Sequence, residues 1–360
     1  LLGFFAVANT PREEEPQIVV PMADVIVSVP GGSPKEVEKT VATPLEKLLW
    51  QIDGVEYVYS TSYRDFAVVT VRYYVGEDRE DSLVKLYNKL NSNTDDVPPA
   101  VTNWVVKPVE VDDVPIVNLT LFSERYDDHE LYRMGEEMLA RLNSVEKISR
   151  TGIRGGRKRE LRVELDAESC AAMNISPLQI VQTIGAADSS LTAGRIEQGN
   201  VESSVVTGPL IMTAQDVREI VVGVYKGRPV YIRDIAKVID GPEERTTYTR
   251  FGWGPASDFS EEERTGSLSS VTLWFSKQKG SNAVNVAEEV IHRAESLKAE
   301  ILPPEVDMQL TRDYGETANE KVNELLLELA IAIVTVVILI GFGLGWREAL
   351  VVALAIPVSF

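Results

Sequence analysis

The stretch MADVIVSVPGGSPKEVEKTVATPLEKLLWQIDGVEYVYSTS, residues 22–62, contains one complete structural unit. Residues 24–29 alternate polar and apolar side chains, which is the pattern of a strand with one buried face. After a Pro-Gly-Gly turn, Ser33-Pro34-Lys35-Glu36 places serine at a helix N-cap, proline at the first helical position and glutamate three residues after the cap. A second strand is expected after Val55-Glu56. The stretch therefore predicts a strand–helix–strand unit.

A second copy of this unit occupies residues 114–152. Its first strand is expected at 116–121, and Asp127 with Glu130 repeats the capping spacing of the first unit. Its last strand follows Val145-Glu146, a Val-Glu pair like the one in the first unit. The two segments therefore predict the same local structure.

Two further segments match each other in the same way. Each has a short strand, an amphipathic helix and a turn with two successive prolines before a second strand. Apolar residues in both helices recur on one helix face. The matching parts are strands at 69–71 and 271–273, helices at 81–91 and 283–299, and proline turns at 97–101 and 302–306.

Pairs of these units predict two ferredoxin-like layers. Two strand–helix–strand units form a β-α-β-β-α-β layer with its helices on one face of an antiparallel sheet. The first pair is nearly contiguous, whereas about 115 residues, 153–267, interrupt the second pair and predict an inserted domain. The predicted fold class is α+β, and chance similarity of generic units is the alternative to a true repeat. Within the insert, strands are expected at 161–165, 203–207 and 229–233, and helices at 177–187 and 214–220.

Both ends of the chain are apolar. Residues 329–346 carry no charge, and as a helix they are about 27 Å long, close to the roughly 30 Å of a bilayer core. A second apolar run starts at Ala349, after a turn at 345–348. Residues 1–8 lack the charged start of a signal peptide, so the tail of a membrane helix is expected there. A buried core helix is the alternative for 329–346.

Composition excludes several classes of function. The net charge of −19 argues against a nucleic-acid partner, because phosphates require a basic surface. The single Cys170 cannot form an intramolecular disulfide, and with His129 and His292 it is too little for a zinc site of Cys and His alone. We therefore expect no catalytic residues, no cofactor and no metal site.

The glycine-rich segment 152–156 precedes Arg157-Lys158-Arg159. It lacks the Gly-Lys-Ser/Thr ending of a phosphate-binding loop. We therefore interpret it as a basic hairpin loop at the boundary of the insert.

Several motifs resemble the resistance–nodulation–division (RND) efflux permease family, and they keep the family's order over nearly the whole chain. They are PGGSPKEVEKTVATPLEKLLWQIDGVEYVYSTS at 30–62, the Val-Pro-Pro segment at 97–99, DDVPI at 112–116, GRPVYIRDIAKV at 227–238, KGSNAVNVAEEV at 279–290 and GWREALVVALAIPVSF at 345–360. The resemblance implies an α+β chain of two ferredoxin-like porter subdomains with an inserted α+β docking subdomain, plus transmembrane helices.

The same resemblance implies domain boundaries. The expected segments are the end of transmembrane helix 1 at 1–10, the first porter subdomain at 17–110, the second porter subdomain split between 111–153 and 267–315, the docking subdomain at 154–266, transmembrane helix 2 at 322–346 and the start of helix 3 at 348–360.

The resemblance also implies a transporter and not an enzyme. Members are secondary active, proton-driven exporters of small molecules that work through a tripartite complex. The implied partners are two further copies in a homotrimer, a periplasmic adaptor protein, an outer-membrane channel and the lipid bilayer. Residues 11–320 are expected in the periplasm and Arg347 in a cytoplasmic turn of the inner membrane. The family's proton-relay aspartates are expected beyond Phe360, outside this chain.

A docking-subdomain arm is expected at 193–208, reaching a neighbouring subunit, with an ordinary surface hairpin as the alternative. This segment is rich in Gly, Ser and Thr.

Substrate contacts are also implied by the resemblance. The strand 145–151 and the segment before the strand at 116–121 occupy positions that line the deep pocket in multidrug members, where those members carry phenylalanines. The smaller and more polar residues here favour a more polar or anionic substrate, and ordinary strand residues are the alternative. The predicted substrate-binding residues are Val114, Pro115, Ser149, Arg150, Thr151 and Trp274.

Two other functions remain open. One is export of lipids or heavy metals by the same superfamily. Only Met134 and Met138 of the six methionines share a helix face, which favours core packing over a soft-metal site. The other is a membrane-anchored periplasmic binding or assembly module without transport.

Overall fold

The computed structural model describes residues 10–13, 18–188, 191–198, 201–207, 211–255, 257, 266–343 and 345–359. The expected end of a membrane helix at 1–10 therefore lies almost wholly outside the described residues, as does Phe360. The chain divides into two compact units, one of Leu1–Leu121, Glu136–Arg154 and Thr272–Phe360, the other of Phe122–Gly135 and Gly155–Val271.

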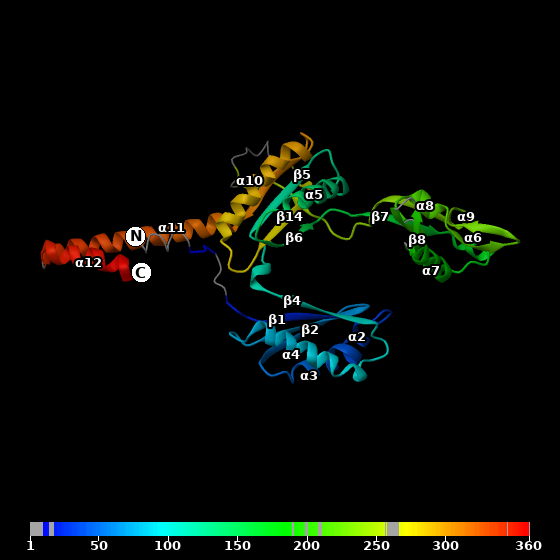
Figure 1. The fold of residues 1–360 in the computed structure, drawn as a ribbon, viewed down its shortest axis with the longest axis horizontal. Helices are drawn as coiled ribbons and strands as arrows, with labels where there is room; N and C mark the ends of the chain where they lie inside the picture. Colours follow the sequence, from blue (N-terminus) through cyan, green and yellow to red (C-terminus); the bar gives the residue numbers. More distant parts are fainter. Residues whose placement is uncertain are drawn as a thin grey trace. The chain divides into compact units, whose positions relative to one another are not determined.

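The first layer is a four-stranded antiparallel sheet in the order β2-β3-β1-β4. Its helices cover one face of the sheet, where Val25, Val69 and Leu86 are fully buried (Figure 1). Ser33 and Glu36 form the predicted capping box, which confirms that expectation. The elements are β1 (Met22–Ser28), α2 (Pro34–Val37), η1 (Glu38–Ala42), α3 (Thr43–Leu49), β2 (Val55–Ser62), β3 (Phe66–Tyr73), α4 (Arg79–Asn91), η2 (Thr94–Asp96) and β4 (Asn103–Val109).

The second layer has the same strand order, β6-β14-β5-β15, with β13 pairing the start of β14. Strands β6, β14, β5 and β15 each have a counterpart in the first layer, whereas β13 has none. This agreement confirms the predicted α+β class and its repeat. The capping bonds between Asp127 and Glu130 are also present, at 3.0 and 2.9 Å. The elements are η3 (Val111–Asp113), β5 (Val117–Ser123), α5 (Asp128–Leu142), β6 (Ile148–Arg154), β13 (Arg250–Phe251), β14 (Leu268–Lys277), α10 (Ala283–Ile301) and β15 (Asp307–Asp313).

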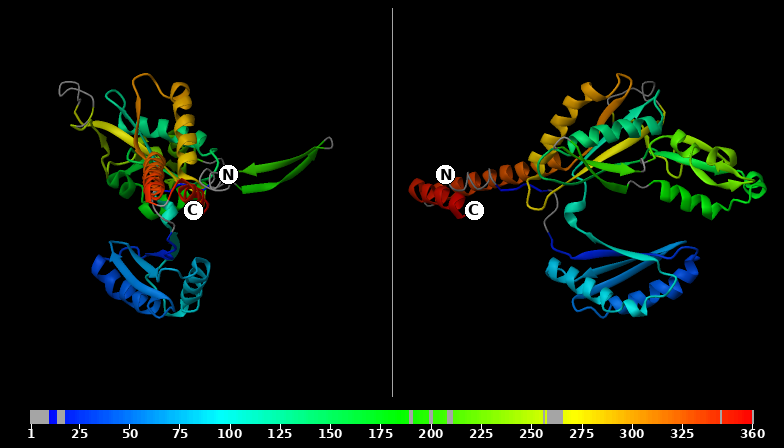
Figure 2. Two further views of the ribbon diagram at one scale, coloured as in Figure 1. Left: turned by 90° about the vertical axis from the view of Figure 1, so that its left-hand side faces the viewer. Right: turned by 45° about the vertical axis from the view of Figure 1, so that its right-hand side comes forward.

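The insert between β6 and β14 contains its own hydrophobic core, in which Ile180, Val217, Ile232 and Val238 are buried. Strands β7 and β12 pair, and β8 with β9 forms a hairpin that extends away from the body of the insert (Figure 2). The elements are β7 (Arg159–Leu165), α6 (Ala167–Ala172), α7 (Pro177–Ala187), β8 (Leu191–Gln198), β9 (Val201–Thr207), α8 (Ala214–Arg218), β10 (Val221–Tyr225), β11 (Arg228–Tyr231), α9 (Ile232–Ile235) and β12 (Ala236–Pro242).

One predicted strand of the insert is wrong at its end. The sequence favoured a strand through Arg233, but β11 stops at Tyr231 and α9 begins at Ile232. The carboxylate of Asp234 accepts the Tyr231 N–H at 2.9 Å, which starts a helical turn. That turn buries both Ile232 and Ile235.

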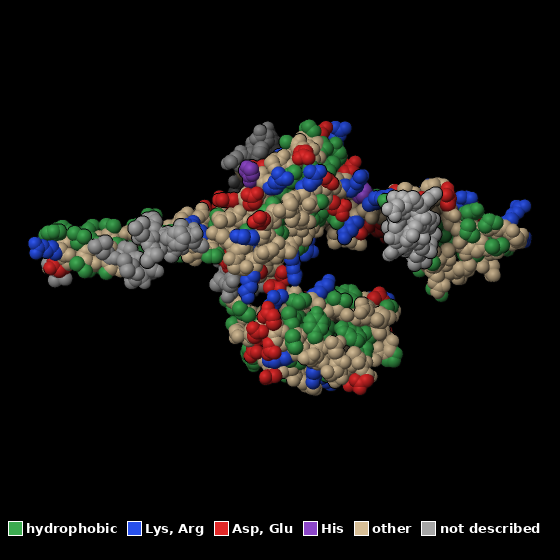
Figure 3. All heavy atoms as spheres, in the orientation of Figure 1, with side chains coloured by type: hydrophobic (Ala, Val, Ile, Leu, Met, Phe, Trp, Pro, Cys, Tyr) green, Lys and Arg blue, Asp and Glu red, His purple; other side chains and the backbone are tan. Residues whose placement is uncertain are grey.

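Helices α11 (Tyr314–Gly343) and α12 (Trp346–Ser359) end the described chain. Helix α11 is long and apolar enough to span a membrane, and its apolar window is not buried within the protein. Figure 3 shows hydrophobic side chains along both helices. The helix begins at Tyr314, before the expected 322, because the Asp313 carboxylate accepts the Glu316 N–H at 3.0 Å directly after β15. Gly345, with a φ of +120°, follows its end.

Candidate functional site

The second layer has one apolar and one polar face. Leu119 of β5 and Phe275 of β14 are fully buried on the face covered by α10. On the opposite face the Thr120 hydroxyl lies 2.9 Å from the Thr272 hydroxyl and 3.1 Å from that of Thr311. This hydroxyl row joins β14, β5 and β15. We call this side of the sheet the open face.

Trp274 lies on the open face, opposite Gly152 of the neighbouring strand β6. A Cβ atom at position 152 would lie 2.6 Å from the indole ring, so only glycine lets the ring rest on the strand backbone. Arg154 faces Thr272 and Arg150 faces Ser276 in the same register. An aromatic ring is thus flanked by two positions that carry guanidinium groups.

Arg150 is held at one end of the open face. Its Nε lies 2.9 Å from the Asp113 carboxylate, and the backbone carbonyl of Asp113 accepts a 2.8 Å hydrogen bond from Ser276 Oγ. Asp113 directly precedes Val114 and Pro115, which are half-buried. The structure therefore places Arg150 next to the segment that contains Val114 and Pro115, two other predicted substrate-binding residues.

Thr151 lies on the other side of the sheet. It is paired with the buried Phe275, and its hydroxyl donates a 2.7 Å hydrogen bond to Asn143 Oδ1. Ser149 falls at a shift in register between Ile148 and Arg150. Of the six predicted residues, Arg150 and Trp274 therefore share the open face, and Thr151 does not join them.

Sequence reasoning missed the hydroxyl row and Arg154. The alternation of Asn118 and Thr120 along β5 was visible, but the register that sets Thr120 beside Thr272 was not. The side-chain oxygen of Asn118 is buried and has no hydrogen-bond partner among the described residues. By strand alternation Asn118 belongs to the open face, but its side-chain oxygen is not accessible to solvent.

A buried cation lies beside the open face. The Lys277 ammonium is 2.9 Å from the Glu13 carboxylate and 3.2 Å from that of Asp112, and its side chain is 7% exposed. Glu13 lies near the start of the described chain and Asp112 lies before β5. The three charges therefore fasten two connecting segments to the end of β14.

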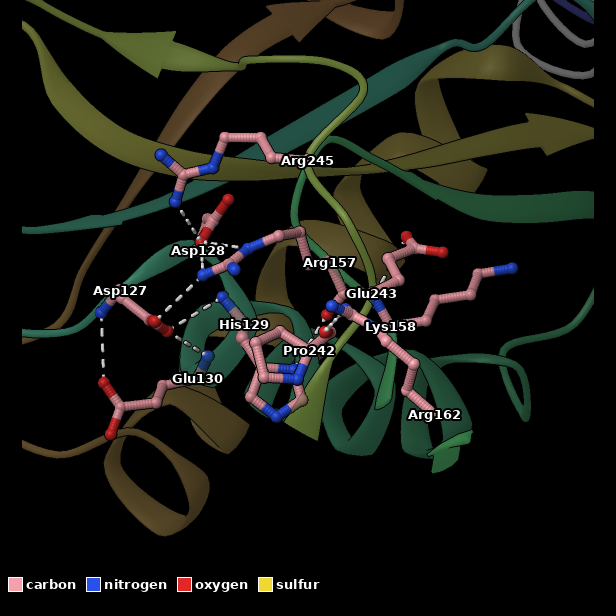
Figure 4. Close-up of polar contacts among 10 residues, drawn as sticks. All are labelled: Asp127, Asp128, His129, Glu130, Arg157, Lys158, Arg162, Pro242, Glu243 and Arg245. Carbon is pink, nitrogen blue, oxygen red and sulfur yellow. Dashed lines mark hydrogen bonds and ion pairs between the residues drawn. The ribbon is translucent and has the colours of Figure 1, made fainter. Parts of the chain in front are cut away.

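The glycine-rich loop lies in the unit that contains the insert, and its two arginines form ion pairs with carboxylates. Figure 4 shows the contacts of Arg157. Arg157 contacts Asp127 at 3.1 Å and Asp128 at 2.7 Å, and Arg245 contacts Asp128 at 3.0 Å. Arg159 forms two 2.7 Å bonds with Asp240. These bonds favour a structural role for the loop and argue against a phosphate-binding role.

Burial by itself would raise the pKa of Asp128. The hydrogen bonds and charges of Arg157 and Arg245 outweigh that effect and hold the pKa below its ordinary value of 3.8. Asp128 is therefore ionised at neutral pH and joins the segments before β7 and after β12.

No group of three or more His, Cys, Asp and Glu side chains that could hold a metal ion occurs among the described residues. The open face instead offers hydroxyls, guanidinium groups and an indole. These groups bind by hydrogen bonding, charge and stacking.

The comparisons with known proteins agree on one group. A model described as the AcrB/AcrD/AcrF family matches residues 1–360. The multidrug resistance protein MdtC of Yersinia enterocolitica is 25% identical over all of this chain and 34% of its own length, as is MdtC of Yersinia pseudotuberculosis. A crystal structure of a heavy metal efflux pump has a TM-score of 0.76 and 23% identity over 99% of this chain and 34% of that one. The chain thus spans about a third of the length of these relatives.

Proposed function

The chain belongs to the AcrB/AcrD/AcrF family of RND efflux permeases, and from this premise we propose that it supplies part of a proton-driven exporter of small molecules. The observation that carries the proposal is the joining of an apolar, membrane-length helix to a repeated α+β layer with a polar open face. Hinge and shear motions of such layers open and close a substrate path. Substrate biases that cycle through its different affinity for the two states.

The substrate is contacted, in this proposal, by the open face of the second layer. Trp274 supplies a ring for stacking, Arg154 supplies positive charge, and the hydroxyls of Thr272 and Thr311 at the ends of the row supply donors and acceptors. This chemistry supports a polar or anionic aromatic substrate. Val114 and Pro115 line one end, and Thr151 contributes through the packing of β6.

The assembly is proposed to be a homotrimer that works with a periplasmic adaptor protein and an outer-membrane channel. Hairpin β8–β9 supports this proposal, because it extends away from its own domain and covers most of the expected arm at 193–208. A two-stranded ribbon alone is marginally stable in water, so a neighbouring subunit is a suitable partner for it.

Helices α11 and α12 are proposed to lie in the inner membrane, with residues 11–320 in the periplasm. The exposed apolar surface of α11 supports a lipid environment. Arg347, in the first turn of α12, favours a cytoplasmic location for the connection between the two helices. The proton relay is assigned to a part of the permease outside this chain.

Heavy-metal export is the second candidate, because one solved structure similar to this chain is a heavy metal efflux pump. Lipid export and a transport-free binding or assembly module complete the alternatives.

The decisive experiment is transport in cells that carry the complete gene or its deletion. Accumulation of an anionic aromatic dye, of a neutral dye and of Zn²⁺ is measured with and without a protonophore. We expect the intact gene to lower accumulation of the anionic dye, and the protonophore to abolish that effect. Lower accumulation of Zn²⁺ alone would favour metal export, and no change in any solute would favour a binding module.

Two variants locate the site within the intact permease. Trp274→Ala is expected to reduce transport of the anionic dye at least fivefold, because the ring is the main apolar contact on the open face. Thr151→Phe, on the helix-covered side, is expected to leave the order of substrate preference unchanged. A Thr151→Phe variant with altered preference and a Trp274→Ala variant without it would contradict the placement of the site.

A further inference from the structure

The first layer contains a cavity of about 430 Å³ between its sheet and its helical side. Val25 and Val27 of β1 form the floor, and both are buried. Leu45 and Leu48 of α3 line one side, and Trp104 of β4 lines another. The cavity is therefore walled by a strand floor, a helix and an aromatic ring.

The connection from α4 to β4 lines the remaining side. It contains η2 and the Val97-Pro98 turn. Proline fixes its own φ, and the turn is held by a 2.9 Å bond from the Val101 N–H to the Pro98 carbonyl. This wall is therefore stiff, which favours a cavity that exists before any ligand enters.

The chemistry of the lining selects a class of ligand. The volume falls within the roughly 300–1,000 Å³ of small-molecule sites, which are mostly apolar with a few polar groups. One cation and one anion, Lys47 and Asp96, line the cavity and balance each other in charge. Neither forms an ion pair with any described residue, and both are exposed. A ligand therefore gains most from apolar burial and from stacking on Trp104.

We propose that this cavity is a second binding site, which takes an uncharged aromatic molecule of drug size. It lies in the first layer, and the open face lies in the second. The inference goes beyond the proposed transport function and does not depend on it.

A cysteine-protection experiment on the intact permease tests the site directly. Cys170 is the single cysteine of this chain and is buried, so a Cys170→Ala background removes the only thiol of this chain that could compete for the label. Any cysteines elsewhere in the permease are replaced as well. Leu48→Cys is then labelled with a fluorescent maleimide, with and without N-phenyl-1-naphthylamine as the neutral aromatic probe. We expect the probe to slow labelling at least fivefold.

Val84→Cys is the matched control, because Val84 lies on α4, is 54% exposed and does not line the cavity. Its labelling rate is expected to stay the same with the probe. Probe that dissolves in lipid or detergent cannot protect position 48, so the comparison separates this cavity from the membrane region.

A filling variant gives a second readout. Val97→Phe, added to Leu48→Cys, places a ring at the half-buried wall and is expected to remove the protection. Val84→Phe adds the same ring outside the cavity and is expected to leave the protection intact.

Equal labelling of Leu48→Cys with and without probe would overturn the proposal. A cysteine at position 48 that the maleimide never reaches would also overturn it, because the cavity would then be closed to solutes. Protection that persists in the Val97→Phe variant would place the probe elsewhere.

Discussion

The two layers share one strand order, yet they place their polar chemistry differently. In the first layer the face away from the helices carries stacked aromatic rings, Tyr57 on Tyr59 at 5.8 Å and Tyr63 on Phe66 at 4.6 Å. Charged side chains lie beside these rings, because the register places Asp24 and Arg72 on the same face. In the second layer the same face carries the hydroxyl row, and Trp274 lies beside arginine positions. The strand pairing is therefore kept in both copies, while the surface that it leaves uncovered has diverged.

The largest expected difference between the layers comes from the buried cation of the second. Lys277→Met removes the buried cation that the Glu13 and Asp112 carboxylates share, which is expected to cost about 3–5 kcal/mol of unfolding free energy. Lys107→Met, on an exposed position of β4, is expected to cost less than about 0.5 kcal/mol. Hydrogen exchange of peptides from β14 and β1 measures the two layers separately. Equal loss of protection in both variants would contradict the distinction.

A pair of glycines with the same φ sharpens the contrast between the glycine-rich loop and an ordinary turn. Gly156 and Gly227 both have a φ of +77°. A Cβ at 156 would lie 2.7 Å from Val271, whereas nothing lies within 4 Å at 227. Gly156→Ala is expected to lower the free energy of unfolding by about 3 kcal/mol, because the positive φ and the steric overlap of the new Cβ both act there. Gly227→Ala is expected to lower it by about 1 kcal/mol, because only the positive φ acts. Thermal unfolding of both variants tests this prediction. Similar losses of stability in the two variants would show that the residues around position 156 shift to relieve the steric overlap.

The ion pairs of Asp128 predict that the stability of the unit containing the insert depends on pH. Because its folded pKa is depressed, Asp128 contributes stability above about pH 4, which is lost as the pH falls through the folded value. Asp128→Asn is expected to cost about 2 kcal/mol at pH 7, and less as the pH approaches 3. Unfolding midpoints between pH 7 and pH 3 measure this. Asp95→Asn, exposed in η2, serves as the control, and a pH-independent loss in Asp128→Asn would exclude the ionic explanation.

The smallest expected effect compares one threonine in each layer. Thr272→Val removes one bond of the hydroxyl row, while Thr120 keeps its contact with Thr311, so a cost of about 1 kcal/mol is expected. Thr70→Val removes a 2.6 Å bond to Asp24, whose carboxylate can turn to water, so about 0.5 kcal/mol is expected. Denaturant unfolding gives both values. A larger loss in the first layer would reverse the comparison.

Local chemistry was predictable from the sequence, and long-range register was not. The capping pairs at Ser33 and Asp127 and the bounds of α7 follow from residues within one turn of each other. The contact of Trp274 with Gly152 depends on which strands pair and in what register, so no spacing reveals it. The same holds for Asp128, whose arginine partners are separated from it in sequence by 29 and 117 residues.

The composition of the candidate site also depends on long-range strand register. The alternation of β6 separates Thr151 from its neighbours Arg150 and Gly152, and only the pairing with Phe275 shows which of them faces the helices. The residues predicted from the resemblance lie on both sides of β6, and the register assigns Arg150 to the open face and Thr151 to the helix-covered side.

The insert occupies the place that a tight hairpin holds in the first layer. Strands β2 and β3 are joined by Tyr63-Arg64-Asp65, whereas β6 and β14 are joined by a whole domain. Asp65 bonds to the backbone of Val29 and Gly32, but Tyr63 and Arg64 are exposed. When two strand ends lie side by side, a folded domain can be inserted between them at little entropic cost. A fluorescent protein or an affinity tag is therefore best inserted between residues 63 and 64. The second layer already carries an inserted domain at the equivalent connection.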